Sequence, residues 1–195
     1  MDWKKHSWIF TLIGLAILIG IVANIDRLFG LDFANKAVYN LTNNPDGIVV
    51  EEFSDFACPF CSQARPEIYR VLNKYDGEIN FMFRHFIVHP ETQLAAEASE
   101  CARDQGKFLE YADMLYDHQD FSRMSLEAYA ANLNLNITEF IRCLDSEEKA
   151  AVIERDYQDA MNRGILGTPY FYVDGKEVPL EYLDLAIEET LNADS

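Results

Sequence analysis

Residues 49–61 read VVEEFSDFACPFC, in which a strand-like run is followed by the motif Cys58-Pro59-Phe60-Cys61. Two cysteines three positions apart at the start of a helix lie on one face, so their sulfurs can meet in a small disulfide ring. With Cys58 as the N-cap, Pro59 takes the first helical position, where its fixed φ fits and its missing N–H costs nothing. The stretch therefore predicts a strand followed by a helix that begins with a redox-active thiol pair.

The two thiols of this motif have different predicted roles. The sulfur of Cys58 would face the unpaired amides of Phe60 and Cys61 and the positive end of the helix dipole, which favour a thiolate. We therefore expect Cys58 to be the attacking thiolate and Cys61, one turn further in, to be the shielded resolving thiol. A zinc half-site is disfavoured because Cys101 and Cys143 are far apart and form no second close pair, so no metal is predicted.

Residues 49–61 resemble the strand and active-site helix of the DsbA-like branch of the thioredoxin superfamily. The resemblance places Glu52, six residues before Cys58, at the position of a buried acid that relays a proton to or from the resolving cysteine. Because side chains alternate along a strand, Glu51 and Glu52 should point to opposite faces, and a solvated strand carboxylate is the alternative for Glu52. Pro66 matches a proline that kinks the active-site helix.

Three further segments extend the resemblance over roughly residues 47–191. Thr168 and Pro169 resemble the cis-proline loop that packs against the disulfide and binds extended substrate through the backbone of the residue before the proline. Residues 95–102 and 140–145 resemble paired segments of a helical insertion. The implied fold class is α/β, a thioredoxin fold with a DsbA-like helical insertion, preceded by one N-terminal transmembrane helix.

The amino-terminal residues indicate export. Residues 7–25 contain no charged side chain and would span roughly 28 Å as a helix, close to the ~30 Å hydrocarbon thickness of a bilayer. Lys4 and Lys5 precede this segment, which places the start in the cytoplasm and the remainder outside. An uncleaved signal anchor is favoured, and a cleaved signal peptide is the alternative.

Export changes the interpretation of the other two cysteines. An oxidising compartment lets disulfides persist, and four cysteines are accounted for by two bridges. We therefore expect Cys101 and Cys143 to form a structural disulfide. A second redox relay is the alternative, although neither residue lies at a proline-opened helix start. His85 and His89 could suggest a metal pair, but surface or capping histidines are the expected reading.

The composition and the turn-forming residues of the chain give the predicted domain organisation. The chain has 195 residues, with 33 acidic and 16 basic side chains, so nucleic acid and anionic lipid surfaces are poor partners. The predicted parts are a cytoplasmic stub and anchor (1–26), a linker (27–46) and a thioredoxin domain (47–195) with a helical insertion at about 91–163. Strands are expected at 48–53 and 79–86, parallel across a helix at 58–75, then a hairpin at 170–178 and a closing helix at 180–191.

The predicted function is a membrane-tethered, extracytoplasmic, monomeric thiol-disulfide oxidoreductase that needs no metal or organic cofactor. It would most simply be an oxidase that donates its disulfide to exported proteins with cysteines, reoxidised by a membrane quinone-linked partner of the DsbB or vitamin K epoxide reductase (VKOR) type, as the resemblance implies. Phe60 stands where oxidising relatives commonly have histidine, so a reductase or isomerase is the alternative. A redox-silent chaperone or binding module on the same fold is the alternative of another class.

Overall fold

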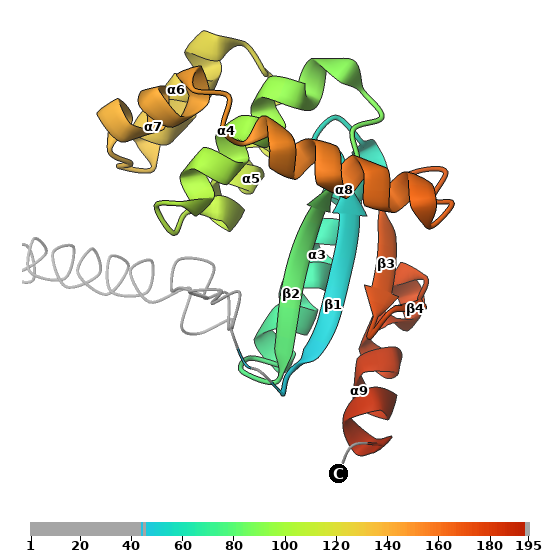
Figure 1. Ribbon diagram of the computed structural model, residues 1–195. Coiled ribbons are helices and arrows are strands. Elements are labelled where there is room, and N and C mark those ends of the chain that lie inside the picture. The colour runs from blue at the N-terminus through green and yellow to red at the C-terminus, as the bar shows by residue number, and fades with distance from the viewer. Residues whose placement is uncertain (1–43, 45, 194–195) are drawn as a thin grey trace, which may run out of the picture. The chain divides into compact units, whose positions relative to one another are not determined.

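The computed structural model describes Asn44 and residues 46–193. Its sheet has four strands in the order β2-β1-β3-β4, and β1 (Ile48–Ser54) is a central strand with neighbours on both sides. Six of the seven residues of β1 are buried, as expected for a strand covered on both faces. Figure 1 shows β1 between β2 and β3, with the long helix α3 packed behind the sheet in this view.

The first half of the fold is a β-α-β unit. β1 pairs in parallel with β2 (Ile79–His85), from Ile48 opposite Ile79 to Ser54 opposite His85. The connecting helix α3 runs Pro59–Lys74, and Pro66 lies within it. The predicted strand pair and helix are confirmed, with β1 one residue longer and β2 one residue shorter than expected.

The second half of the sheet is antiparallel. β3 (Tyr170–Val173) pairs with β1, and β4 (Lys176–Glu177) completes a hairpin with β3. The two residues of the hairpin turn, Asp174 and Gly175, have φ values of 46° and 74°, the backbone that a type I′ turn requires. A short 3₁₀ turn η3 (Leu180–Tyr182) then leads into the closing helix α9 (Leu183–Ala193).

Between β2 and β3 the chain forms the helical insertion. It begins with the 3₁₀ turn η2 (Pro90–Thr92), and its five helices are α4 (Gln93–Arg103), α5 (Phe108–His118), α6 (Arg123–Asn132), α7 (Ile137–Asp145) and α8 (Ala150–Asn162). Figure 1 shows α4 to α7 gathered beyond the end of the sheet where β1 stops, with α8 lying across the same end. The insertion therefore covers the end of β1 from which the Cys58 motif follows.

A partly buried ion cluster fastens α8 to the sheet. The carboxylate of Glu51 on β1 is 3.1 Å from Arg84 Nε on β2 and 2.7 Å from Arg163 Nη1, just after α8. Arg84 also reaches Asp156 on α8, with Nη1 2.8 Å from Oδ1. Asp159, one turn further along α8, lies 2.8 Å from Arg163. The buried carboxylates of Glu51 and Asp156 are thus matched by positive charges across three elements, which fixes the insertion on this face.

The predicted membrane anchor (1–26) and most of the predicted linker (27–46) lie outside the described residues. Within residues 46–193, no helix combines the length and the apolar character needed to cross a bilayer.

Candidate active site

Cys58 is the N-cap of α3, with extended backbone angles and Pro59 at the first helical position. Its sulfur accepts a hydrogen bond from the amide of Cys61 at 3.3 Å and donates one to the carbonyl oxygen of Thr168 at 3.3 Å. An amide of the helix and a carbonyl of the loop therefore both hydrogen-bond the same sulfur. An amide that points at this atom is already placed to stabilise negative charge on it.

Cys61 is the more deeply placed thiol. Cys58 and Cys61 are both free, and their exposed fractions are 5% and 0%. Burial raises the pKa of Cys61 well above its usual value, and the hydrogen bond with Cys58 adds to this effect. Hydrogen bonds with the side chains of Ser54 and Thr168 act in the opposite direction. Cys61 is thus held as a thiol at neutral pH, and its sulfur needs a proton whenever it leaves a disulfide.

Glu52 lies on β1 and is buried, with 3% of its surface exposed. Burial raises its pKa to about 7, although a hydrogen bond with Ser54 and the charge of Arg65 lower it somewhat. A carboxyl group with a pKa near neutrality can both give and accept a proton under ordinary conditions. The alternative of a solvated strand carboxylate is wrong, because the residue is enclosed between the sheet and the helices.

The loop before β3 covers the thiols. The Thr168–Pro169 peptide bond is cis, and the carbonyl of Thr168 faces Cys58 as described. Two exposed apolar side chains belong to the segments that meet at this sulfur: Phe60 is 67% exposed and Leu166 is 95% exposed. Large apolar side chains left in solvent beside a reactive group are typical of a surface that binds a partner chain.

Asp55 organises the turn that precedes the motif. Its buried carboxylate accepts hydrogen bonds from the amides of Ala57 at 2.8 Å, Val88 at 2.7 Å and His89 at 2.8 Å. Its own carbonyl accepts the amide of Cys58 at 3.1 Å. One side chain therefore joins the loop after β2 to the segment that positions Cys58, and Asp55 is not among the site residues predicted from the sequence.

The family model described as thioredoxin matches residues 44–190, three quarters of the chain. The chain belongs to the thioredoxin family. The thioredoxin fold with a helical insertion, expected from the resemblance to DsbA-like proteins, is confirmed.

Solved structures place this thioredoxin-family chain among DsbA-like folds. A thioredoxin-like oxidoreductase from Silicibacter pomeroyi superposes with a TM-score of 0.67 at 26% identity, over 76% of this chain and 90% of its own. The thiol-disulfide exchange protein alpha-DsbA2 from Wolbachia pipientis gives a TM-score of 0.68 at 20% identity, over 87% and 93%. BdbD from Bacillus subtilis gives 0.64 at 24% identity, over 77% and 89%.

The curated relatives are much longer proteins. A Na(+)/H(+) antiporter NhaA 3 from Salinispora tropica is 38% identical over 133 residues, which cover 66% of this chain and 20% of the antiporter. An NhaA from Herminiimonas arsenicoxydans is 31% identical over 147 residues, 75% of this chain and 24% of that protein. The chain thus spans about a fifth of the first of these relatives and about a quarter of the second.

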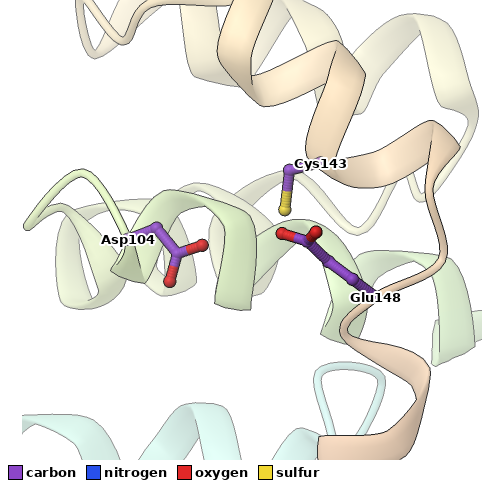
Figure 2. A group of neighbouring side chains, drawn as sticks. All are labelled: Asp104, Cys143 and Glu148. Atoms are coloured by element: carbon purple, nitrogen blue, oxygen red, sulfur yellow. The ribbon is translucent and has the colours of Figure 1, made fainter.

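In the insertion, Cys101 on α4 and Cys143 on α7 are joined by a disulfide with a Cα–Cα distance of 5.9 Å. Figure 2 shows Cys143 beside the carboxylates of Asp104 and Glu148, whose ligand atoms lie within 4.8 Å of one another and of the sulfur. The sulfur is bonded to Cys101 and so is not a thiolate, and Asp104 is already paired with Lys149 at 2.6 Å. This trio does not have the free thiolate that a zinc site with cysteine uses.

The expectation for His85 is wrong. His85 is 1% exposed, and its Nε2 lies 2.8 Å from Glu100 Oε1. Burial opposes ionisation of Glu100, but hydrogen bonding to His85 and the charge of Arg103 outweigh it and lower the pKa of Glu100 to about 2. His85 therefore joins β2 to α4 from inside the core, whereas the half-exposed His89 has its Nδ1 3.3 Å from Asp55.

Three residues around Glu52 were also missed: Ser54, Arg65 and Tyr116. Ser54 had a sequence signal, because it is two positions after Glu52 and therefore on the same face of the strand. No local sequence signal marked Arg65 or Tyr116. Tyr116 reaches Ser54 only because the insertion folds back on the sheet, since the two residues are 62 positions apart.

Proposed function

We propose that this chain is a thiol-disulfide oxidoreductase that acts as an oxidase of exported proteins. The single observation that supports this most strongly is the placement of Cys58, whose sulfur caps α3 and touches the carbonyl of Thr168. An amide-stabilised sulfur at a helix start makes the reduced pair favourable, so the disulfide form tends to oxidise its partner.

The proposed reaction begins with the Cys58–Cys61 disulfide. A substrate thiolate attacks Cys58, so that a substrate–Cys58 bond forms, the Cys58–Cys61 bond breaks, and Cys61 leaves with the electron pair and gains a proton. A second thiolate of the substrate attacks the first substrate sulfur, forming the substrate disulfide and releasing Cys58 as a thiolate. Two electrons pass from the substrate to the pair.

The surroundings of the thiols suit an extended, incompletely folded substrate. The cis Thr168–Pro169 bond is proposed to hold a substrate strand through the backbone of Thr168, and the exposed side chains of Phe60 and Leu166 are proposed to offer it apolar contact. Glu52 is proposed to supply the proton that Cys61 needs. A folded protein would keep its apolar side chains inside, so this surface favours chains that still expose them.

The cellular setting is proposed from the sequence and from the DsbA-like fold. A tether formed by residues 1–26 would hold the domain, as a monomer, at the extracytoplasmic side of the membrane, where a quinone-linked partner of the DsbB or vitamin K epoxide reductase type would remove its electrons. A reductase or isomerase is the second candidate, because Phe60 gives the thiolate of Cys58 neither a hydrogen bond nor a positive charge. No antiport activity is proposed, since the shared segment is a small part of the antiporters.

The reduction potential of the Cys58/Cys61 pair tests the direction of electron transfer between this chain and its substrates. The purified full-length chain is equilibrated with glutathione mixtures and the free thiols of the pair are counted by alkylation. A potential near or above about −150 mV supports the oxidase, since strong oxidants lie near −120 mV. A potential near about −250 mV, close to that of thioredoxin, would favour the reductase. Thiols that do not exchange at all would leave only a redox-silent binding module.

A further inference from the structure

The turn between β1 and α3 determines where the sulfur of Cys58 lies. In this turn the carbonyl of Asp55 accepts the amide of Cys58 at 3.1 Å. On the other side of Cys58, its carbonyl accepts the amide of Ser62 at 3.2 Å, in the first turn of α3. Both backbone groups of Cys58 are therefore fixed, and its sulfur meets the amide of Cys61, 3.3 Å away, as long as the turn keeps this shape.

The side chain of Asp55 holds this turn from within. Its Oδ1 accepts the amide of Ala57, two residues later, at 2.8 Å, which is the Asx turn that aspartate favours. Its Oδ2 accepts two amides of the loop after β2, those of Val88 at 2.7 Å and His89 at 2.8 Å. The carboxylate is fully buried. Because hydrogen bonds to a carboxylate are roughly twice as strong as neutral ones, the turn and the loop are held firmly together.

Gln119 holds the same turn from the helical insertion. It ends α5 in a left-handed backbone conformation, with a φ of 52°, and its Nε2 donates to the carbonyl of Phe56 at 2.7 Å. The same nitrogen lies 3.2 Å from the carbonyls of Leu115 and Tyr116 in the last turn of α5. Gln119 thus ties the end of α5 to Phe56, 63 positions earlier in the chain.

Asp55 and Gln119 hold opposite ends of one peptide group. The amide of Ala57 donates to Asp55, and the carbonyl of Phe56, in the same peptide group, accepts from Gln119. A peptide group is planar, so fixing both its N–H and its C=O fixes its orientation. The fully buried ring of Phe56 also stacks on Phe83, with the ring centroids 5.4 Å apart. Side chains, and not a helix or a strand, therefore set this peptide group.

We infer that Asp55 and Gln119 are positioning residues for the attacking thiol of Cys58. They orient the peptide group one residue before Cys58, so that the chain enters α3 with the sulfur at the helix amides. The two hydrogen bonds of the sulfur itself go to other groups, so both residues act through the backbone. This inference rests on the proposed thiol-disulfide function, and it gives the insertion a part in the reactivity of the thiol.

The test compares the reactivity of Cys58 in reduced, full-length variants. Iodoacetamide alkylation at pH 7 is located by peptide mass spectrometry, and the absorbance at 240 nm that alkylation removes reports the thiolate. Asp55→Asn keeps the size of the side chain but has one acceptor oxygen for three amides. It should slow alkylation of Cys58 by about tenfold or more, as expected when a hydrogen bond to a charged group is lost.

The sign of the change separates positioning from a direct effect of charge. A nearby negative charge disfavours a thiolate, so removing the charge of Asp55 without moving the turn would speed the alkylation of Cys58. Loss of positioning slows it and also destabilises the reduced pair, which makes the disulfide less oxidising. A tenfold change in the equilibrium with glutathione corresponds to about 30 mV, so the potential of Asp55→Asn should fall by about that amount.

Asp156→Asn is the matched control for a loss of stability. Asp156 is 2% exposed, accepts the amide of His85 at 3.2 Å and bonds Arg84 at 2.8 Å. Its replacement should destabilise the fold, because a buried carboxylate with a backbone partner is lost, as in Asp55→Asn. The alkylation rate of Cys58 in the folded protein should nevertheless stay within about twofold of wild type.

Gln119→Ala removes the contact from α5 alone. It should slow alkylation of Cys58 by about threefold, since a hydrogen bond between neutral groups contributes less than one to a carboxylate. Gln158→Ala is its control, because Gln158 is also an exposed glutamine but bonds Glu154 within α8, and it should keep the wild-type rate.

The outcomes separate this inference from the proposed function. A wild-type rate and potential in folded Asp55→Asn or in Gln119→Ala would overturn the positioning role, and so would faster alkylation in Asp55→Asn. If circular dichroism shows that Asp55→Asn does not fold, Gln119→Ala decides alone, since its side chain is exposed. If the wild-type disulfide does not exchange with glutathione, the proposed function fails, while the alkylation rates still decide whether the turn positions Cys58.

Discussion

Glu51 and Glu52 are neighbours on β1 and both are buried, yet their carboxylates lie on opposite faces of the sheet in opposite electrostatic settings. Glu51 is 6% exposed and is held by two arginines, Arg84 and Arg163. Glu52 is 3% exposed, and burial raises its pKa to about 7. One strand thus presents an ion-paired carboxylate to α8 and a titratable carboxyl group to the thiols.

Glu52→Gln should remove a pH dependence of stability in the reduced protein. The folded pKa of about 7 lies above the ordinary value of 4.5, so the folded state holds a proton that the unfolded state loses between these pH values. Wild-type stability should therefore be greatest below about pH 4.5 and fall as the pH rises through about 7, by on the order of 3 kcal/mol.

Urea unfolding at pH 4 and pH 8 measures this effect. The stability of Glu52→Gln relative to wild type should increase between the two pH values, whereas Glu139→Gln, at an exposed position on α7, should track the wild type. A relative stability of Glu52→Gln that is the same at both pH values would contradict the assignment.

Glu51→Ala should destabilise the fold by about 1–3 kcal/mol, because Arg84 and Arg163 lose their shared partner although each keeps a second carboxylate, Asp156 and Asp159 respectively. Chemical unfolding monitored by circular dichroism gives the value. Arg155→Ala is the matched control: its side chain is 67% exposed, and its nearest contact with Asp156 is 3.9 Å, so the change should stay within about 0.5 kcal/mol. Equal effects of the two substitutions would show that the cluster contributes no stability.

Phe60→His should make the Cys58/Cys61 pair more oxidising. A histidine between the two cysteines can place a positive charge or a donor near the Cys58 thiolate, which stabilises the reduced form. A stabilisation of about 1.4 kcal/mol corresponds to about 30 mV for this two-electron couple. Equilibration with glutathione measures the shift. Phe60→Leu retains an apolar side chain and should leave the potential unchanged; a similar shift in both variants would mean that loss of the ring, and not the new charge, is responsible.

Replacing both Cys101 and Cys143 with alanine should lower the stability by about 2–4 kcal/mol, because the unfolded chain loses the constraint of a bridge between residues 42 positions apart. The rate of glutathione exchange at Cys58 should not change, since the bridge joins α4 and α7 inside the insertion. Thermal unfolding and exchange kinetics on the same sample test both statements. A changed exchange rate in a folded double variant would revive the alternative of a second redox relay.

The local elements were predictable where the sequence contains local signals. Proline at the first helical position placed the start of α3, and the Asp174-Gly175 dipeptide placed the hairpin turn. Strand ends were off by one residue, because backbone pairing continues as far as the partner strand allows: Ser54 still pairs with His85.

The missed features depend on partners distant in sequence. The cations that hold Glu51 lie 33 and 112 residues away, and no local pattern marks that pairing. The error at His85 has the same origin, because its burial is decided by Glu100 of α4 and by the rings of Phe56 and Phe108, which lie outside its strand. The alternation of side chains along the strand places Ser54 on the same face as Glu52. Its hydrogen bond with Tyr116 could not be predicted, because Tyr116 lies 62 residues later in the chain.

The order of the segments along the chain has a consequence for synthesis. The carbonyl that contacts the Cys58 sulfur belongs to Thr168, 110 residues later, and β3 must pair with β1 before that loop is in place. A chain that emerges amino-terminus first therefore presents the CPFC pair, and then Cys101, before the covering loop exists. The first polypeptide that a newly made CPFC pair can meet is therefore the part of the same chain that has not yet folded.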